Sequence, residues 1–574
     1  MADPLVTLHD LLVPAFEAVA GRRVDPVVRA SDRADAQANG SLPLAKELGR
    51  PPREVAEAVL AAADLARVGT AELAGPGFIN VTFHPEFLAE QLALAAADDH
   101  LGVRSAPAAR RVVVDYSAPN VAKEMHVGHL RSTVIGDSLA RVLAFVGHDV
   151  VRENHIGDWG TPFGMLIEHL LDVGEASSTE LSVGDLDGFY RQARTKFDAS
   201  EEFQERSRQR VVALQGGDPE TVRLWHVLVA ESTRYFNQVY SRMDVLLTDD
   251  DIVGESSYNA ELPDVLARLH TAGLLTTSDG ADVVFPPGFT NRDGDPLPLI
   301  VQKGTGGFNY ATFDLACVID RIERVGADTV LYVVGAPQSQ HFQMVFAVAR
   351  MAGWVPDTTD LVHVPFGNVL GADRKMLKTR SGETVKLVDL LDEAILRAAA
   401  AVLEKNPDLP EAERVKVAER IGIGAVKYAD LSNDRIKDYV FDWDRMLAFD
   451  GNTAPYLQYA HARIRSIFRR SELDAAAFRS VRPTLGEPQE RTLAKALLGF
   501  DAAVQLTLES YAPHKLCTYL FDLASAFTGF YEACPVLKAD DEATRSSRLA
   551  LCDLTARVLA CGLGLLGIEA PDQM

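Results

Sequence analysis

The clearest chemistry in this chain is suggested by two histidines. His126 and His129 flank Gly128 in an HxGH pattern, with Lys123 just before them. Imidazoles at positions i and i+3 near a helix start share one face, and the exposed backbone N–H groups there attract anions. Such rings can donate hydrogen bonds to a phosphate that gains charge in a transition state. The motif therefore points to chemistry at a nucleotide phosphate, with Gly128 leaving room for a flat base near the backbone.

The flanking sequence predicts the elements that would position this pair. Residues 111–116 form an apolar run typical of a short buried strand, and apolar residues recur at helical spacing from 127 to 146. A second strand-like run follows at residues 149–154. Strand, loop, helix and strand make a right-handed parallel unit, and ligands bind such sheets beyond the carboxyl ends of the strands. A surface pair that only caps a helix is the alternative for a bare HxGH motif, and this context favours the nucleotide site.

Composition and charge narrow the class of protein. A chain of 574 residues with 47% apolar residues is typical of a soluble globular protein with several domains. We expect no membrane span, no secretion signal, and a cytoplasmic location, and five cysteines without CxxC spacing argue against structural zinc or disulfides. The net charge of −24 argues against a protein that coats nucleic acid, but it permits local basic faces that grip one RNA.

The hydrophobic pattern divides the chain into three predicted domains. Residues 1–106 read as a small α+β domain, residues 107–440 as a sheet domain, and residues 441–574 as helices. Within the sheet domain, strand signals return at 329–335 and 361–366, after a charged, helical insertion at about 165–300. We expect a multidomain α/β protein with a Rossmann-type parallel sheet, a helical insertion, an α+β N-terminal domain and an all-α C-terminal domain.

Other nucleotide-binding motifs are absent or misplaced. The sequence has no GxxxxGK(S/T) loop, which excludes a P-loop NTPase on pattern. A GxGxxG match at residues 562–567 follows a helical stretch near the end of the chain. It has no room for the strand-helix-strand unit that a dinucleotide needs, so we predict a helix terminus there.

A family resemblance adds to this reading. Residues 117–133 strongly resemble the first signature of the class I arginyl-tRNA synthetases, and residues 157–160 continue the likeness. The resemblance covers nearly the whole chain through several independent motifs. The further matching segments are 38–40, 75–80, 378–387, 424–432 and 451–456.

The resemblance implies a two-step reaction. Such an enzyme joins L-arginine to ATP as arginyl-adenylate, releases pyrophosphate, and then esterifies the terminal adenosine of its cognate tRNA. Family members are unusual in needing tRNA for the first step. In-line displacement at a phosphate is catalysed mostly by positioning and charge stabilisation. We expect ATP as a substrate carrying Mg²⁺, no protein-bound metal, no membrane partner and a monomer.

The second class I signature is normally a KMSK loop, and here it is degenerate. The corresponding segment, residues 374–380, departs from that consensus, and family members of this kind are thought to compensate with a lysine in the place of Lys123. By resemblance, Lys378 and Arg380 are expected to bind pyrophosphate. Lys375 could equally be a solvated charge on the loop. The residues expected to act in catalysis or to contact ATP are Lys123, His126, Gly128, His129, Lys378 and Arg380.

Arginine recognition requires a partner for a guanidinium, which favours a carboxylate that accepts two parallel hydrogen bonds. Tyr310 and Asp314 lie four apart, so they would share a helix face, and they match the family's guanidinium pair. Without the resemblance, Asp314 reads as a solvated helix charge. By resemblance, Gln338 is a candidate to bind the α-amino and carboxylate groups of arginine. It could equally be a loop residue with no role in binding. The expected arginine contacts are Asp115, Ser117, Ala118, Pro119, Asn120, His129, Tyr310, Asp314 and Gln338.

The C-terminal region has the residues that RNA binding uses. Residues 445–470 hold five arginines and one aspartate, interleaved with aromatic residues. Arginine and aromatic side chains suit phosphates and splayed bases, although most of these aromatics also fit a helix core. By resemblance this is the anticodon-binding domain, and the N-terminal domain is expected to contact the tRNA elbow. The expected tRNA contacts are Arg463, Arg465, Arg469 and Arg470.

Two other classes of protein remain as alternatives. One is another HxGH adenylate-forming ligase, which would leave the long helical C-terminal region unexplained. The other is a non-catalytic RNA-binding paralogue, against which the intact His126, Gly128, His129 and Asp314 argue.

Overall fold

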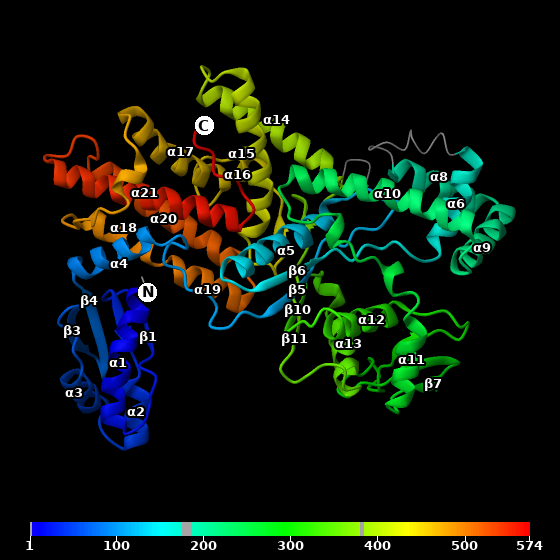
Figure 1. Cartoon of the computed structure of the whole chain (residues 1–574), viewed down its shortest axis with the longest axis horizontal. Coiled ribbons are helices and arrows are strands. Elements are labelled where there is room, and N and C mark those ends of the chain that lie inside the picture. Colours follow the sequence, from blue (N-terminus) through cyan, green and yellow to red (C-terminus); the bar gives the residue numbers. More distant parts are fainter. Residues whose placement is uncertain (1–2, 175–185, 379–383) are drawn as a thin grey trace. The chain divides into compact units, whose positions relative to one another are not determined.

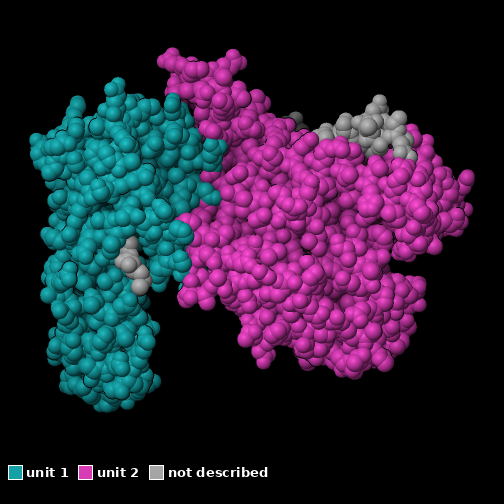
Figure 2. Space-filling view, viewed as in Figure 1, with its two compact units in different colours: residues 1–105, 448–564, 569–574 teal, residues 106–447, 565–568 magenta. Residues whose placement is uncertain are grey.

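The structure is a computed structural model that describes residues 3–174, 186–378 and 384–574. It divides into two compact units, which are coloured separately in Figure 2. One unit holds residues 1–105, 448–564 and 569–574, and the other holds residues 106–447 with 565–568.

The larger unit is built on a four-stranded parallel sheet. Its order is β11 (Asp360–His363), β10 (Thr329–Tyr332), β5 (Arg111–Asp115) and β6 (Asp149–Glu153), as Figure 1 shows. All four strands and the parallel sheet were predicted from apolar runs, and the structure confirms them. The valines of β5 are fully buried, as expected for a parallel strand covered on both faces.

Helix α5 (Val127–Phe145) makes the crossover from β5 to β6. It is buried along most of its length, because other elements cover it on several sides. Gly136 lets it pass close to the end of β5, since an added Cβ would lie 2.3 Å from the Tyr116 side chain. The start of α5, where the histidine pair lies, is thereby held at the carboxyl edge of the sheet.

The insertion between β6 and β10 begins as the predicted helical region and ends differently. Its helices are α6 (Pro162–Val173), α8 (Leu186–Ala199), α9 (Glu201–Gln215), α10 (Pro219–Arg242) and α11 (Leu262–Thr271), with short turns η1 (Asp249–Asp251) and η2 (Glu255–Tyr258). A three-stranded antiparallel sheet then follows, made of β7 (Thr276–Ser278), β8 (Ala281–Val284) and β9 (Leu299–Gln302). Strands of three or four residues are too short to give a clear alternating pattern in the sequence.

The elements after the insertion complete the larger unit. Helix α12 (Tyr310–Glu323) precedes β10, and η3 (Ala336–Gln338) and α13 (Ser339–Met351) follow it. Helices α14 (Leu387–Lys405) and α15 (Glu411–Leu431) both pack against α5. Arg131 of α5 and Asp430 of α15 form a fully buried ion pair at 3.2 Å. The unit also contains the two-stranded pair β12 (Val369–Leu370) and β13 (Tyr439–Val440), and the short helix α16 (Trp443–Met446).

The smaller unit joins the two ends of the chain. Its N-terminal part is an antiparallel sheet in the order β1 (Val28–Ala30), β2 (Ala36–Ala38), β4 (Phe78–Phe83) and β3 (Gly69–Ala74), with α1 (Pro4–Ala20), α2 (Ser41–Leu48), α3 (Pro52–Ala62) and α4 (Pro85–Ala97). Its C-terminal part consists of α17 (Ala454–Ser471), η4 (Ala475–Phe478), α18 (Pro488–Leu498), α19 (Phe500–Ser510), α20 (His514–Ala533) and α21 (Glu542–Leu565). These elements confirm the predicted α+β and all-α regions. Arg104 ties the two parts together through Asp501 at 2.7 Å.

The GxGxxG match lies at a helix end, as predicted. Gly562 and Gly564 belong to α21, which ends at Leu565, and Gly567 has a left-handed φ of 66° just beyond it. Across the described ranges, no helix combines the length and apolar character needed to cross a membrane.

Candidate active site

The loop between β5 and α5 has an unusual backbone. Ser117, Ala118 and Ala122 have φ angles of 75°, 50° and 60°, although none is a glycine. Such conformations cost on the order of 1–3 kcal/mol each and persist only where the surroundings hold them. The Ser117 N–H donates to Ser132 Oγ at 2.9 Å, and the Ala118 N–H donates to Asn154 Oδ1 at 3.0 Å. The strain therefore lies in the segment that the resemblance assigns to arginine.

Helix α10 holds the same loop from another side. Tyr240 Oη lies 2.7 Å from Ser117 Oγ and accepts from Asn154 Nδ2 at 3.1 Å. Ser232 Oγ accepts the Ala122 N–H at 2.9 Å. All three contacts are buried. A helix more than a hundred residues away in sequence thus fixes the loop that leads to the histidines.

The two histidines cap α5 by exchanging hydrogen bonds with the backbone. His126 is the N-cap residue, and its Nδ1 accepts the Gly128 N–H at 3.0 Å. The His126 N–H in turn donates to His129 Nδ1 at 3.1 Å, and the ring centroids lie 4.0 Å apart. Because each Nδ1 accepts a backbone proton, each neutral ring carries its own proton on Nε2. The pair therefore presents two Nε2–H donors.

Electrostatics keep His129 neutral. Burial, with further contributions from His126 and Lys123, lowers its pKa to about 3. Gly128 has a role inside the cap, because an added Cβ would lie 2.7 Å from Cε1 of the His126 ring. The His126 ring therefore requires a glycine at position 128 whether or not a nucleotide base is bound. The site thus consists of uncharged, prepositioned donors at a helix start.

Lys123 lies close enough to the histidine pair to lower the pKa of His129. It also has a neighbour in the insertion. Its Nζ lies 4.7 Å from the centroid of the Tyr190 ring on α8. An ammonium over an aromatic face at this distance is a cation–π contact. The lysine that the resemblance names as a substitute for the second signature is therefore part of this site.

The second signature meets the first through its flanks. The Val127 N–H donates to Val385 O at 3.0 Å, and the Leu387 N–H donates to Met125 O at 2.9 Å. Lys378 is exposed and forms an isolated β-bridge with Thr384. Arg380, also predicted for catalysis, lies outside the described residues. The segment that follows the second signature is thus joined by backbone hydrogen bonds to the residues on either side of His126.

Asp314, which was predicted to bind the guanidinium, contacts His341, and the His341 ring lies beside Tyr310. His341 Nε2 on α13 lies 2.5 Å from Asp314 Oδ2, and the Tyr310 and His341 rings are 4.7 Å apart. The Asp314 side chain remains 22% exposed, so a ligand can still reach this carboxylate. Gln338 is exposed in η3, directly before the helix that carries His341.

A second carboxylate near Asp314 was missed in the sequence. Burial raises the pKa of Glu255 to about 7; His155 opposes this effect, and Asp158 and Asp314 add to it. Glu255 therefore lies near Asp314, in agreement with the packing of η2 against α12. No motif or periodicity marks Glu255, because it lies in a short turn of the insertion that only the fold brings to α12.

Asp115 has a different environment from the open pocket residues. Its Oδ2 accepts from Arg321 Nη2 at 2.8 Å, and Arg321 Nε donates to Glu153 Oε2 at 2.7 Å. Arg321 is fully buried, and Asp115 and Glu153 are paired residues of neighbouring strands. The triad neutralises two carboxylates at the ends of β5 and β6, so Asp115 is already engaged within the fold.

Pro119 and Asn120 lie beside Gly157 and so connect two of the segments that carry the resemblance. The Val121 N–H donates to Gly157 O, and the Gly157 N–H donates to Pro119 O, each at 3.1 Å. An added Cβ on Gly157 would lie 2.4 Å from Asn120 Oδ1. Asn120 and Ala118 are exposed, whereas Pro119 is buried.

The arginines predicted for RNA lie on α17 in the smaller unit, on two of its faces. The Arg463 guanidinium lies 4.4 Å from the Tyr531 ring centroid, and Arg470 is exposed one heptad further on. Arg465 Nε pairs with Asp572 Oδ1 at 3.0 Å, and Arg469 Nη1 donates to Asp572 O at 3.2 Å. Residues two apart in a helix point in different directions, so the four arginines do not form one continuous surface.

Fold and site together define a class of protein. The histidine pair lies at the first crossover of a parallel sheet, its neighbours bond the segment that follows the second basic signature, and the same unit contains Asp314 and Glu255. This is the arrangement of a class I aminoacyl-tRNA synthetase. The model of the family described as "tRNA synthetases class I (R), catalytic domain" matches residues 91–443. Models of the "DALR anticodon binding domain" and the "Arginyl tRNA synthetase N terminal domain" match residues 457–574 and 8–83.

Individual relatives narrow the class to one family. The arginine–tRNA ligase of Thermobifida fusca is 53% identical over the full length of both chains. The arginyl-tRNA synthetase structure from Plasmodium falciparum has a TM-score of 0.86 at 28% identity and covers 99% of each chain. The Thermus thermophilus structure has a TM-score of 0.80 at 26% identity, covering 99% of this chain and all of its own. This chain belongs to the arginine–tRNA ligase family.

Proposed function

We propose a division of labour within the site by which this chain attaches L-arginine to tRNA at the expense of ATP. One end of the site handles the phosphates of ATP, and the other recognises the arginine side chain. The observation that carries the proposal is the histidine cap, in which backbone hydrogen bonds to both Nδ1 atoms fix the two rings and place their protons on Nε2. Neither alternative from the sequence is supported by the family comparisons.

At the phosphate end, His126 and His129 donate Nε2–H bonds to the α-phosphate as arginine's carboxylate attacks it. The bond from the carboxylate oxygen to phosphorus forms while the bond to pyrophosphate breaks. Donors held in place before the reaction stabilise the new charge without reorganisation. Lys123, Lys378 and Arg380 then hold the departing pyrophosphate, together with Mg²⁺ that arrives with ATP. Gly128 leaves the base room at the helix start.

At the arginine end, Asp314 accepts the guanidinium, Tyr310 flanks it, and Glu255 adds a second negative charge. The exposed Asn120 and Gln338, with the strained segment from Ser117 to Pro119, face the α-amino and carboxylate groups. Asp115 acts through Arg321, which holds the end of β5 in place, because its carboxylate is already paired. A permanent cation in an acidic pocket gains charge-assisted bonds that a neutral analogue cannot make.

For the tRNA, the proposed division is an N-terminal domain at residues 1–106, a catalytic domain at 107–440 and a helical domain at 441–574. The helical domain binds the anticodon through α17, and the N-terminal domain contacts the elbow of the tRNA. Arg470 is exposed to solvent, whereas Arg465 and Arg469 must exchange the Asp572 contacts for phosphates. We further propose that the chain acts as a monomer in the cytoplasm.

The decisive experiment is ATP–pyrophosphate exchange with each amino acid, with and without tRNA. We expect exchange with arginine alone among the amino acids, and only when cognate tRNA is present. Exchange driven by another amino acid would overturn the arginine assignment. Arginine-dependent exchange without tRNA would leave the enzyme assignment intact and remove the tRNA requirement.

A further inference from the structure

The segment that follows β6, residues 154–158, contacts three parts of the site proposed for arginine. Asn154 Oδ1 accepts the Ala118 N–H in the strained loop. His155 Nε2 lies 4.0 Å from Sγ of Cys317 on α12, one helical turn beyond the predicted guanidinium ligand. The third part is the η2 turn, with which the segment pairs directly. The segment is therefore placed to set the spacing among the groups that bind arginine.

Backbone hydrogen bonds join this segment to the stretch that carries Glu255. The Asn154 N–H donates to Asp251 O at 2.7 Å, and the Val253 N–H donates to Asn154 O at 3.1 Å. The Glu255 N–H donates to Ile156 O, also at 3.1 Å. These bonds hold the Glu255 backbone alongside the segment after β6.

Asp158 completes this pairing with its side chain. It is 4% exposed, and both of its carboxylate oxygens accept from Ser256, Oδ1 from the N–H at 2.8 Å and Oδ2 from the hydroxyl at 2.6 Å. Gly254 packs so closely on the same carboxylate that an added Cβ would overlap it. The Asp158 carbonyl accepts from Trp225 Nε1 of α10 at 2.8 Å, which holds the acid itself in place. Asp158 therefore contacts the residues on both sides of Glu255.

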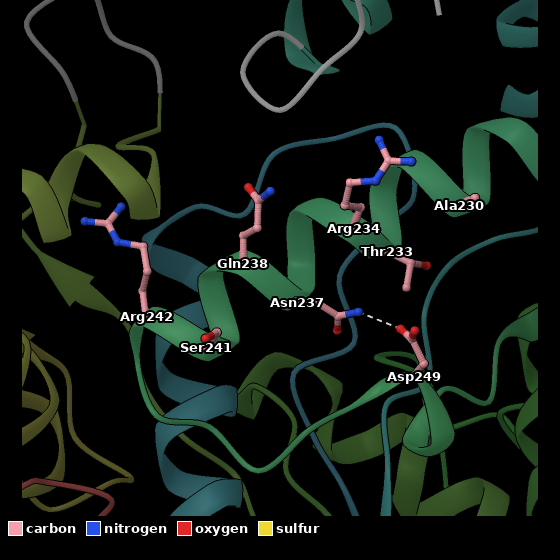
Figure 3. Close-up of a pocket in the computed structure, with 8 residues that line it drawn as sticks. All are labelled: Ala230, Thr233, Arg234, Asn237, Gln238, Ser241, Arg242 and Asp249. Atoms are coloured by element: carbon pink, nitrogen blue, oxygen red, sulfur yellow. Dashed lines mark hydrogen bonds between the residues drawn. The ribbon is translucent and has the colours of Figure 1, made fainter. Parts of the chain in front are cut away.

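The chain that leads into this turn is anchored independently of Asp158. Asp249 accepts from Asn237 Nδ2 of α10 at 2.5 Å, the bond drawn in Figure 3. Asp251 Oδ2 accepts from the Thr248 N–H at 2.8 Å and from Thr248 Oγ1 at 3.0 Å. Loss of the Asp158 side chain should therefore release the η2 turn without undoing the η1 turn before it.

We propose that Asp158 is a positioning residue for arginine recognition. By holding Gly254 and Ser256, it keeps the carboxyl group between them near Asp314, where the guanidinium binds. Arginine presents a planar fork of donors, so Glu255 is effective only in a fixed direction, and a loosened turn weakens binding without touching the ligand. The inference rests on the proposed arginine site and goes beyond it, because none of the contacts proposed there involves Asp158.

The test compares Asp158→Ala with Asp158→Asn. Alanine removes both bonds to Ser256, whereas asparagine can accept from the Ser256 N–H with Oδ1 and donate to the Ser256 hydroxyl with Nδ2, so it keeps the clamp and loses the charge. We expect Asp158→Ala to raise the KM for arginine about tenfold, within the range for coupled residues in contact, with kcat and the KM for ATP little changed. Asp158→Asn should restore the KM for arginine to within about threefold of the original, well under a tenfold change.

Two further variants separate this role from a general loss of structure. Asp251→Ala is the matched control, since Asp251 is also a buried acid of this region that accepts one N–H and one hydroxyl, and it should leave the KM for arginine unchanged. Glu255→Ala tests the route of the effect. If Asp158 acts through Glu255, adding Asp158→Ala to Glu255→Ala should have little further effect on the KM for arginine.

Amide hydrogen exchange at residues 254–256 measures the clamp itself and needs no substrate, and it should be faster in Asp158→Ala than in Asp158→Asn. Three outcomes would overturn the inference. They are an asparagine variant as damaged as the alanine variant, a full additional loss in the double variant, or unchanged exchange in Asp158→Ala. Calorimetry of arginine binding needs no turnover, so a protein that binds arginine in this Asp158-dependent way but activates none would sink the proposed function and leave the inference standing.

Discussion

The two ends of the active site solve opposite electrostatic problems. At the proposed phosphate end, hydrogen bonds to the backbone fix His126 and His129, and burial lowers the pKa of His129 to about 3. At the proposed arginine end, Asp314 contributes to the raised pKa of the neighbouring Glu255 carboxyl group. Neutral, fixed dipoles suit a charge that appears only in the transition state, whereas a carboxylate suits a ligand that carries its charge from the start.

This contrast predicts that damage at the two ends will affect different kinetic constants. Loss of a group that binds the ground state and the transition state equally raises KM, whereas loss of a group that acts only in the transition state lowers kcat. The four predictions below test that separation, beginning with the largest expected effect.

Asp314→Asn should produce the largest change. It preserves the volume of the side chain but removes the charge opposite the guanidinium, and breaking one partner of a buried charged pair costs roughly 2–5 kcal/mol. Steady-state kinetics should show a large rise in the KM for arginine, little change for ATP, and a narrowed preference for arginine over neutral citrulline. Tyr310→Phe serves as the milder comparison. A KM for arginine within about threefold of the original, under the tenfold change that 1.4 kcal/mol represents, would place the guanidinium elsewhere.

His129→Ala and His126→Ala should mainly lower turnover. Removing one donor to a developing oxyanion costs about 2.7–4 kcal/mol, and the KM values should move far less. Single-turnover formation of the adenylate is the appropriate measurement. Thermal unfolding is the control, because His126 also caps α5 and loss of a cap costs about 1 kcal/mol. Adenylate formation at the original rate in both variants would make the pair purely structural.

Glu255 should give arginine binding a pH dependence. Its pKa is raised to about 7, so the carboxyl group is largely neutral at pH 6 and largely ionised at pH 8. A cationic ligand prefers the ionised form, so the KM for arginine should fall by up to about tenfold as the pH rises through this window. Glu255→Gln should flatten the profile. A profile that is equally steep in the variant would assign the titration to another group.

The smallest effects are expected on α17. Neutralising one arginine that contacts a phosphate should lower the slope of log affinity against log salt by about 1 without changing adenylate chemistry. Arg463→Gln and Arg470→Gln report on one face of the helix, and Arg465→Gln and Arg469→Gln on the other. A reduced slope for one pair alone identifies the RNA-facing side. Unchanged slopes for all four would move the RNA surface off this helix.

Much of the catalytic sheet could be predicted because its information is local. The strands at 111–116 and 149–154 contain short runs of valine, and the helix between them has a clear period, so the crossover and its ligand edge follow from the pattern. His126 and His129 could be chosen for the same reason, since their partner groups lie within three residues. Even the division of the α17 arginines into two faces was present in their spacing.

Other features depended on contacts between distant parts of the chain. Tyr240 and Ser232 hold the strained loop from a helix of the insertion, and Glu255 joins Asp314 from a turn that no motif marks. Asp115 was expected to face the ligand, but its register beside Glu153 places it in the buried pairs with Arg321. The strands β7 to β9 are too short to show the alternation of apolar and polar residues that predicts a strand.

The sequence by itself determined the class of chemistry, because HxGH after a buried strand and before a periodic helix is a pattern of neighbouring residues. Tertiary structure decided how that chemistry is supported. Burial lowers the pKa of His129, and the folded insertion supplies Glu255 and the hydrogen bonds that hold the loop before α5. Desolvation and long-range pairing depend on which segments meet in space, and residues a hundred positions apart leave no local pattern that reveals their contact.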